Sequence, residues 1–208
     1  MKMQIIDTLE QGTPEWHQAR CGIITMSCLQ SVMSTGRQED GFGVGAISYM
    51  FELIGERFTG SVDIAPAGYH ARRGHELEPV VCAGYEEITG SKVDHVGIIL
   101  NHGVGYSPDG LVGSDGLIEI KTKLPKLQAE VLFTDEVPKE HIDQLQGGLW
   151  VSGREWIDFI SYSEGMPTFM KRVYRDEEYI RKIATRVKAF YQIMERRIET
   201  IINNSVEI

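Results

Sequence analysis

The sequence predicts an α/β protein in which a mixed central β-sheet is flanked by helices. Apolar residues recur at helical spacing in residues 46–58 and again after Asp176. Residues 117–121, LIEIK, alternate apolar and charged side chains as a half-buried strand does. Two runs rich in β-forming residues, 156–162 and 168–174, lie on either side of a short turn. Helices and strands that alternate in this way favour a layered α/β fold.

Composition limits the possible partners and compartments. The 208 residues are 42% hydrophobic, so we expect one core and a single domain over residues 1–208. The formal net charge of -9 provides no global attraction to DNA or to a membrane, so any DNA contact must be local. Three cysteines, Cys21, Cys28 and Cys82, show no CxxC spacing, which indicates a reduced compartment. We find neither a signal-peptide pattern nor a membrane-spanning run and expect a cytoplasmic protein.

The first elements of the chain are predicted to be helices separated by a loop. Thr13 and Pro14 are typical of an N-cap and a first helical residue, and Gly22 is typical of a helix end. Residues 34–45 are polar and rich in glycine, which predicts a loop. Residues 46–58 then form a core helix.

The middle of the chain changes from helix to strand. Residues 67–88 are mostly helical, but Pro79 should break or kink that helix just after Glu78. Residues 93–100 are predicted as one strand, followed by a turn at 101–103.

The last third of the chain contains three further helices and a strand pair. Helices are predicted over about 126–133 and 139–150, separated by Pro138, and residues 163–167 join the two strands described above. Asp176 is a good N-cap for a long C-terminal helix. Its apolar stripe contains Ile180, Ile183, Val187, Phe190, Met194, Ile198 and Ile201. The outer face of that helix is basic, and we expect it to be the solvated face of a packing helix and not a DNA-binding face.

The segment 105–123, GYSPDGLVGSDGLIEIKTK, is the strongest candidate for chemistry. Turn residues at 113–116 predict that its two halves form a hairpin or near-hairpin. Side chains two residues apart share a face, so Glu119 and Lys121 point the same way and Asp109 can lie alongside them. Two carboxylates and an ammonium suit phosphodiester hydrolysis, because carboxylates bind Mg²⁺ and a cation can orient the attacking water.

The pattern alone leaves an alternative open. Glu119 and Lys121 could form a surface ion pair worth under about 1 kcal/mol. No competing site is indicated elsewhere. His70 and His75 are five residues apart and do not share a helical face. The glycines of residues 41–45 lack the sequence of a nucleotide-binding loop.

Four motifs in order resemble the phage lambda exonuclease family, also called the YqaJ viral recombinases, a branch of the PD-(D/E)XK nuclease superfamily. The motifs are WHQARCGIITMS from Trp16, GHELEP from Gly74, SPDG from Ser107 with EIK from Glu119, and QLQ from Gln144 with LWV from Leu149. The resemblance implies a restriction-endonuclease-like core.

The resemblance also implies a metal site. Asp109 and Glu119, with the backbone carbonyl of Ile120, would bind Mg²⁺, with Mn²⁺ able to substitute and a second ion sharing Asp109. Lys121 would orient and activate the attacking water. Glu78 would complete the acidic cluster, directly or through metal-bound waters.

Two further sets of residues match family positions. Gln144 matches a glutamine that hydrogen-bonds near the nucleophile or the phosphate. Arg20, Ser27 and Ser107 match a pocket for a terminal 5′-phosphate, which suits an arginine fork and hydroxyl donors. Two alternatives stay open, because Ser27 could simply cap a helix and Arg20 could form a surface ion pair.

The implied function is processive 5′-to-3′ digestion of linear double-stranded DNA by a ring-shaped homotrimer in a bacterial host. It would leave a 3′ single strand for a single-strand annealing protein in phage recombination. One alternative is another PD-(D/E)XK enzyme, an endonuclease or a RecB-like nuclease. The other is a non-catalytic scaffold that binds DNA ends.

Overall fold

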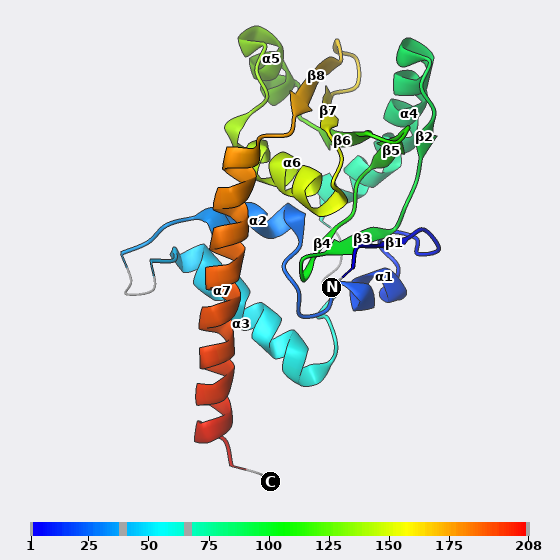
Figure 1. The fold of residues 1–208 in the computed structure, drawn as a ribbon. Coiled ribbons are helices and arrows are strands. Elements are labelled where there is room, and N and C mark those ends of the chain that lie inside the picture. Colours follow the sequence, from blue (N-terminus) through cyan, green and yellow to red (C-terminus); the bar gives the residue numbers. More distant parts are fainter. Residues whose placement is uncertain (1, 38–40, 65–67, 207–208) are drawn as a thin grey trace.

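The computed structural model describes residues 2–37, 41–64 and 68–206, which form helices around two β-sheets (Figure 1). The strands are β1 (Gln4–Ile6), β2 (Val93–Asp94), β3 (Ile98–Asn101), β4 (Val104–Tyr106), β5 (Gly110–Val112), β6 (Gly116–Thr122), β7 (Trp156–Tyr162) and β8 (Phe169–Tyr174). The α-helices are α1 (Pro14–Ala19), α2 (Leu29–Met33), α3 (Val44–Thr59), α4 (Tyr69–Thr89), α5 (Pro125–Thr134), α6 (Lys139–Ser152) and α7 (Glu177–Asn204), and a 3₁₀ turn spans Met26–Cys28.

The larger sheet is mixed, as predicted. Its strand order is β2-β5-β6-β7-β8, and its neighbours are antiparallel except for the parallel pair β6 and β7. Parallel neighbours require a long crossover, which α5 and α6 provide. The smaller sheet, β1-β3-β4, lies beside it.

The prediction of one strand over residues 93–100 is wrong, because the chain changes sheets there. β2 pairs with β5 in the larger sheet, whereas β3 pairs with β1 and β4 in the smaller one. Gly97 lies at the change. Its N–H donates to Ile6 O at 3.0 Å, and a Cβ at this position would lie 2.4 Å from Leu9 O. The chain therefore bends at Gly97, where its backbone lies close to that of the N-terminal segment. The spacing of apolar residues does not indicate such a contact.

Central strand β6 is buried on both faces. Leu117 belongs to the main core beside α6, while Ile118 and Ile120 pack with Val81 and Tyr85 of α4. β6 pairs with β7 along its whole length but with β5 only as far as Ile118. Among the described residues, no strand pairs with this edge of β6 from residue 119 onward.

Pro79 was predicted to break or kink its helix, and the break is wrong, since α4 continues through Pro79. Pro79 and His75, whose carbonyl loses its donor, are both exposed, so water can hydrate that carbonyl. The buried side chains of Val81, Cys82 and Tyr85 hold the helix on the sheet. Residue 67, where the predicted helix began, lies outside the described residues.

The predicted loop 34–45 is confirmed in part. Residues 38–40 lie outside the described residues, and α3 begins two residues earlier than predicted, at Val44. Thr35 and Phe42 form an isolated antiparallel bridge. Arg186 of α7 donates to Ser34 O at 2.6 Å, which fixes the loop to the core. Arg186 is thus a packing residue, although the basic face of this helix was predicted to be solvated.

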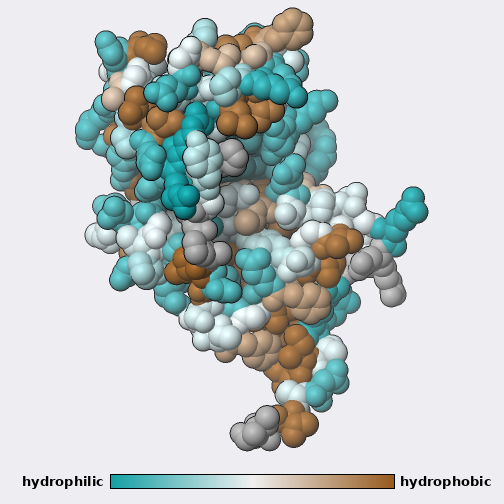
Figure 2. Space-filling model, turned by 180° about the vertical axis from the view of Figure 1, so that it is seen from behind, coloured by the Kyte–Doolittle hydropathy of each residue, from teal (hydrophilic) through white to brown (hydrophobic). Residues whose placement is uncertain are grey.

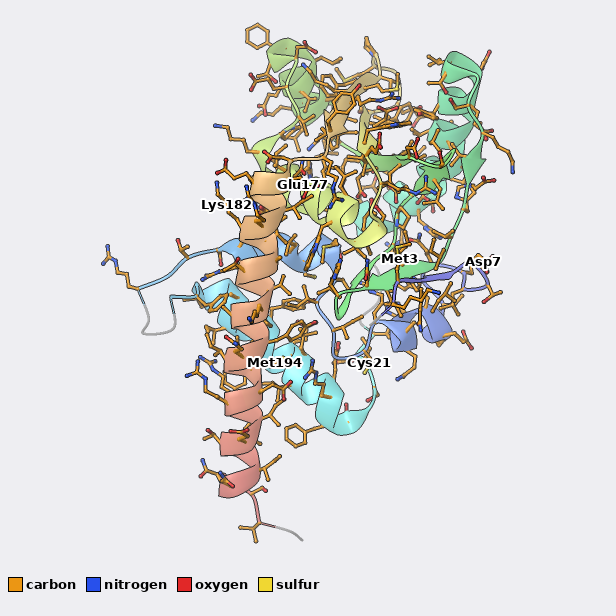
Figure 3. The ribbon with its side chains drawn as sticks, in the orientation of Figure 1. Met3, Asp7, Cys21, Glu177, Lys182 and Met194 are labelled. Carbon is orange, nitrogen blue, oxygen red and sulfur yellow. The ribbon has the colours of Figure 1, made fainter. Side chains whose placement is uncertain are left out.

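Helix α7 follows its prediction closely. The Asp176 carboxylate accepts from the N–H groups of Glu178 at 2.9 Å and Tyr179 at 3.0 Å. Figure 3 shows Glu177 at the start of the helix, where an acidic side chain stabilises the helix dipole. The stripe through Met194 packs against α2, α3 and α6.

The surface mixes hydrophilic and hydrophobic residues over the face in Figure 2, where the hydrophobic ones continue toward the tapering C-terminal end. Within the described ranges, no helix is long and apolar enough to cross a bilayer.

A buried ion pair ties β7 to β8 and α4. Asp158 is 3% exposed, and both its oxygens accept from Arg172 at 2.8 Å. The Tyr85 hydroxyl donates to the same carboxylate at 2.8 Å, and the Arg172 guanidinium lies 3.5 Å from the Trp156 ring centroid. Asp158 therefore depends on Arg172 for its charge balance.

Arg172→Ala should lower the free energy of unfolding by about 3 kcal/mol, because it leaves a buried carboxylate without its cation. Urea denaturation measures the change. Arg181→Ala, which removes an exposed α7 arginine, serves as control and should change stability by less than about 0.5 kcal/mol. Equal effects of the two substitutions would contradict the importance of the pair.

Candidate functional site

The candidate site lies where the chain passes from the smaller sheet to the larger one. β4 ends at Tyr106 and β5 begins at Gly110, so Ser107 and Asp109 lie in the connection between the sheets. The Gln11 side chain holds this connection by donating to Pro108 O at 2.9 Å. Asp109 thereby comes to the unpaired edge of β6.

Glu119 is the most constrained residue of the site. It is 2% exposed and accepts three hydrogen bonds from three different elements. The Tyr106 hydroxyl donates to Oε2 at 3.0 Å, while Lys121 Nζ at 2.7 Å and Gln144 Nε2 at 2.6 Å both donate to Oε1. Glu119 and Lys121 are therefore not an exposed surface pair.

Asp109 approaches the backbone of β6 directly. Its Oδ2 accepts from the Ile120 N–H at 2.5 Å. The N–H and C=O of one strand residue point to the same side, so the Ile120 carbonyl also faces the edge where Asp109 lies. Burial, and next the negative charge of Glu119, raise the pKa of Asp109 well above its ordinary value. A cation between these groups would relieve both effects.

The donor set fits a divalent cation that prefers oxygen ligands. Within the described residues no three carboxylate, imidazole or thiol groups form a metal cluster. A cation here would therefore depend on Asp109, Glu119 and the Ile120 carbonyl. Carboxylate and carbonyl oxygens are the ligands that Mg²⁺ and Mn²⁺ accept.

The lysine and the tyrosine of the site both keep their protons. Burial lowers the pKa of Lys121, but Glu119 and Asp109 outweigh that effect and raise the pKa above its ordinary value. Burial raises the pKa of Tyr106 well above its ordinary value, and Glu119 and Asp109 act in the same direction. Lys121 is thus a charged donor, and Tyr106 is a neutral one.

Glu78 is near these residues but does not line their cavity. It faces a neighbouring cavity of about 210 Å³ together with His75 and His95, and its Oε2 lies 3.9 Å from His75 Nδ1. Burial raises the pKa of Glu78, and repulsion by Glu119 contributes in the same direction. Within the described chain, we find no hydrogen bond from Glu78 to the other predicted site residues.

The structure brings the predicted phosphate-binding residues into the cavity of the carboxylates. This cavity measures about 190 Å³. Its lining includes Arg20, Ser27, Ser107, Asp109, Glu119, Lys121 and Gln144. An isolated parallel bridge between Thr25 and Gly105 explains the convergence, because it places the segment after α1 beside β4.

Arg20 is oriented by its neighbours. Its guanidinium lies 4.0 Å from the Trp16 ring centroid and donates to Thr25 Oγ1 at 3.3 Å. Trp16 in turn donates from Nε1 to Ser107 Oγ at 2.9 Å. Burial lowers the pKa of Arg20, although its ordinary value is so high that the group stays charged. Arg20 is thus held inside the cavity rather than in a surface ion pair.

Ser27 does not cap a helix. It lies within the 3₁₀ turn, and the residue before that turn, Thr25, makes no side-chain capping bond. The exposed Ser27 hydroxyl lies 3.2 Å from Thr25 Oγ1. Ser27 is therefore available to a ligand in the cavity.

Sequence reasoning missed two residues that shape the site. Tyr106 lies in the predicted segment 105–123 but was given no role there, yet its hydroxyl donates to Glu119. Gly148 of α6 makes room for it, because a Cβ there would lie 2.7 Å from Tyr106 Cζ. The adjacent glycines 147 and 148 inside a helical pattern were a signal of such close packing.

This mixed sheet, with flanking helices and a buried acidic site, defines an α/β protein of the lambda-exonuclease-like fold class. The family profile of the YqaJ-like viral recombinase domain matches residues 15–155, and the chain belongs to that family. The predicted family resemblance is thereby confirmed.

Solved structures of exonucleases are similar to this chain. LHK-Exo, an alkaline exonuclease from Laribacter hongkongensis, matches with TM-score 0.83 and 38% identity over 92% of this chain and 97% of that chain. Its complex with dAMP matches with TM-score 0.82 and 38% identity, over 91% of this chain and 96% of that chain. A phage-related exonuclease from Haemophilus somnus 129PT shares the fold, with TM-score 0.68 at 15% identity, over 86% and 96% of the two chains. No curated protein sequence matches the chain.

His141 borders the site one helical turn before Gln144. Its Nε2 lies 3.1 Å from Lys123 Nζ, and its ring stacks on Phe159 with centroids 5.2 Å apart. Burial, then the positive charges of Lys123 and Lys121, lower the pKa of His141 to about 4. The imidazole is therefore neutral in the folded protein and accepts a hydrogen bond from the lysine.

Folding stability should fall as pH is lowered from about 6.5 to about 4, because in that window the unfolded His141 binds a proton that the folded one excludes. His141→Gln should reduce this slope. Urea denaturation at several pH values measures it, with exposed His75→Gln as the control. Identical slopes for the wild type and His141→Gln would contradict the buried neutral imidazole.

Proposed function

We propose that this protein is a Mg²⁺-dependent exonuclease that digests linear double-stranded DNA processively in the 5′-to-3′ direction. It would leave 3′ single strands for recombination by strand annealing. One observation carries the proposal: Asp109, Glu119 and Lys121 line the same cavity as Arg20, Ser27 and Ser107. A group that binds a terminal phosphate and a group that cleaves a phosphodiester then act on adjacent parts of one strand.

Asp109, Glu119 and the Ile120 carbonyl would hold the metal, and a second ion would share Asp109. When bound, Mg²⁺ or Mn²⁺ supplies Lewis-acid stabilisation of the phosphoryl oxygens and activates water as a nucleophile. The carboxylates of Asp109 and Glu119 would hold these ions in the cavity. The short contact from the Ile120 N–H fixes one Asp109 oxygen and leaves Oδ1 for a ligand.

Lys121 and Gln144 would orient the reacting groups. Both donate to Glu119 Oε1, and each has further N–H donors for water or for a phosphate oxygen. The raised pKa of Lys121 keeps it a charged donor, so it positions the water and offsets the negative charge of the phosphate. Glu78, in the neighbouring cavity, would act through water between the two cavities.

The proposed direction of digestion is supported by the residues that would bind a terminal phosphate. Arg20 offers a planar fork of donors, and Ser27 and Ser107 offer hydroxyls, which together suit a phosphate dianion. The relative crystallised with dAMP binds a nucleoside monophosphate, the kind of product that such a reaction releases. A terminal 5′-phosphate at this position places the first phosphodiester near Asp109 and Glu119.

A ring of three subunits would compensate for the net charge of -9. A closed ring holds DNA topologically and therefore needs less attraction per subunit. We propose this single-domain chain as its subunit, acting in the cytoplasm of a bacterial host with a single-strand annealing protein as partner. Light scattering tests the trimer, and a monomeric mass would exclude the ring.

Lys121→Ala should lower kcat/KM on linear duplex DNA by about 100-fold or more while binding to DNA ends is retained, because it removes the donor that orients the water. Steady-state digestion with Mg²⁺ and a DNA-binding titration measure the two effects. Lys126→Ala, which removes an exposed lysine of α5, is the control. Mg²⁺-independent digestion, or equal digestion of a closed circle, would exclude the proposed exonuclease.

Arg20→Ala should selectively remove the preference for a 5′-phosphate. A charged hydrogen bond contributes about 1.5–3 kcal/mol, so the rate ratio between 5′-phosphate and 5′-hydroxyl ends should fall roughly 10- to 100-fold. Digestion of matched duplexes with each end measures it, with Arg181→Ala as control. An unchanged ratio would remove Arg20 from the phosphate pocket.

A further inference from the structure

Tyr191 of α7 joins two segments that carry site residues and lie far apart in the sequence. Its hydroxyl accepts from the Ile24 N–H at 2.9 Å and donates to Gly103 O at 2.7 Å. Ile24 lies between Arg20 and Ser27, which belong to the predicted phosphate pocket. Gly103 comes immediately before β4, the strand that leads into the connection between the two sheets. One hydroxyl from a third element therefore links the segment after α1 to the start of β4.

The Tyr191 hydroxyl takes the place of a hydrogen bond in a parallel ladder. The Gly105 N–H donates to Ile24 O at 2.9 Å, next to the parallel bridge between Thr25 and Gly105. In a parallel ladder the N–H of that same residue donates to the carbonyl two residues earlier on the partner strand, which here is Gly103 O. The hydroxyl of Tyr191 lies between these two groups and contacts both. The two segments are therefore held apart at this point by one oxygen atom.

Tyr191 is fixed in position and keeps its proton. Its ring packs against the main core, and the Arg57 guanidinium lies 5.4 Å from the ring centroid. Arg57 Nε also donates to Gly22 O at 2.9 Å, and a Glu56 oxygen accepts from the Gly22 N–H at 2.7 Å. Burial raises the pKa of Tyr191 above its ordinary value, so its hydroxyl can both donate and accept. Helices α3 and α7, which contact each other (Figure 1), thus hold the segment that follows α1.

We propose that Tyr191 is a positioning residue that sets the separation between Arg20 and the cleavage site, and thereby the preference for a 5′-phosphate end. The inference rests on the proposed function. Arg20 and Ser27 come from the segment on one side of the Tyr191 hydroxyl, and Asp109 comes from the connection after β4 on the other side. A change in the separation of the two segments therefore moves the phosphate donors relative to the cleavage site. A misplacement of about 1 Å can cost roughly 100-fold in rate.

A purely structural role for Tyr191 makes a different prediction. Loss of its hydroxyl would then leave the Ile24 N–H and Gly103 O without their partner, which lowers stability and reduces activity on every DNA end alike. If Tyr191 positions Arg20, loss of the hydroxyl changes the separation of the two segments and affects the ends that carry a phosphate. A 5′-hydroxyl end has no terminal phosphate for Arg20 to hold, so its rate reports all other effects of the substitution.

The test is the ratio of kcat/KM on linear duplexes with 5′-phosphate ends to kcat/KM on the same duplexes with 5′-hydroxyl ends, measured with Mg²⁺. The wild type is compared with Tyr191→Phe, Arg20→Ala, the double variant and Tyr85→Phe. Both ends are digested by one preparation of each protein, so a loss of folded protein cancels in the ratio. Tyr85→Phe is the matched control, because it removes a hydroxyl that donates to Asp158, and that carboxylate still accepts twice from Arg172.

Tyr191→Phe should lower this ratio by about 5-fold or more, through a loss on 5′-phosphate ends, while Tyr85→Phe keeps the ratio of the wild type. In the double variant, Tyr191→Phe should add little to the effect of Arg20→Ala, because both substitutions act on the same phosphate. Equal losses on both ends, an unchanged ratio, or fully additive effects overturn the role of Tyr191. The proposed function stands in each of these cases if Arg20→Ala alone lowers the ratio. A wild type that does not prefer 5′-phosphate ends excludes the phosphate pocket itself, and the role of Tyr191 with it.

Discussion

The buried carboxylate of Glu119 is the constraint on which the rest of the structure depends. An ionised carboxylate at 2% exposure is costly unless several donors meet it. Here those donors come from three elements, because Lys121 lies on β6 itself, Tyr106 of β4 is 13 residues from Glu119 in the sequence, and Gln144 of α6 is 25 residues from it. The smaller sheet, the central strand and the crossover helix must therefore take their relative positions together. The glycines of α6 permit this, because they let the helix lie close to the Tyr106 ring.

An element of the fold could be predicted where the local sequence pattern determines it, and could not be predicted where a tertiary contact determines it. The N-cap and apolar stripe of α7 are local, and both were predicted. The division of residues 93–100 between two sheets was not, because it follows from the contact of Gly97 with the N-terminal segment. The helix α4 also continues through Pro79, where a break or a kink was predicted. Its packing on the sheet outweighs one lost hydrogen bond, and no local rule contains that packing.

The candidate site also combines residues that a local pattern predicts with residues that only tertiary contacts bring together. Alternation in β6 predicts that Glu119 and Lys121 share a face, and the structure adds that this face is buried. Nothing in the spacing of Arg20, Ser27 and Ser107 indicates that they meet, and only the family resemblance suggested it. The bridge between Thr25 and Gly105 is the physical cause of their meeting, and a long-range backbone contact of that kind has no sequence signature. Glu78 was expected to complete the cluster directly or through metal-bound waters, and its side chain lines the neighbouring cavity.

An acidic protein that binds a polyanion needs its positive charge where the phosphates lie. Around the cavity the fixed cations are Arg20 and Lys121, while Asp109 and Glu119 bring negative charge. Burial, and next the negative charge of Glu119, raise the pKa of Asp109 well above its ordinary value, so this carboxylate is costly to ionise without a cation beside it. A divalent cation would make the site more positive locally and couple metal binding to DNA binding, since each would reduce the electrostatic cost of the other. The cavity would then attract phosphate only when loaded with metal, and the acidic surface elsewhere would disfavour contacts away from a DNA end.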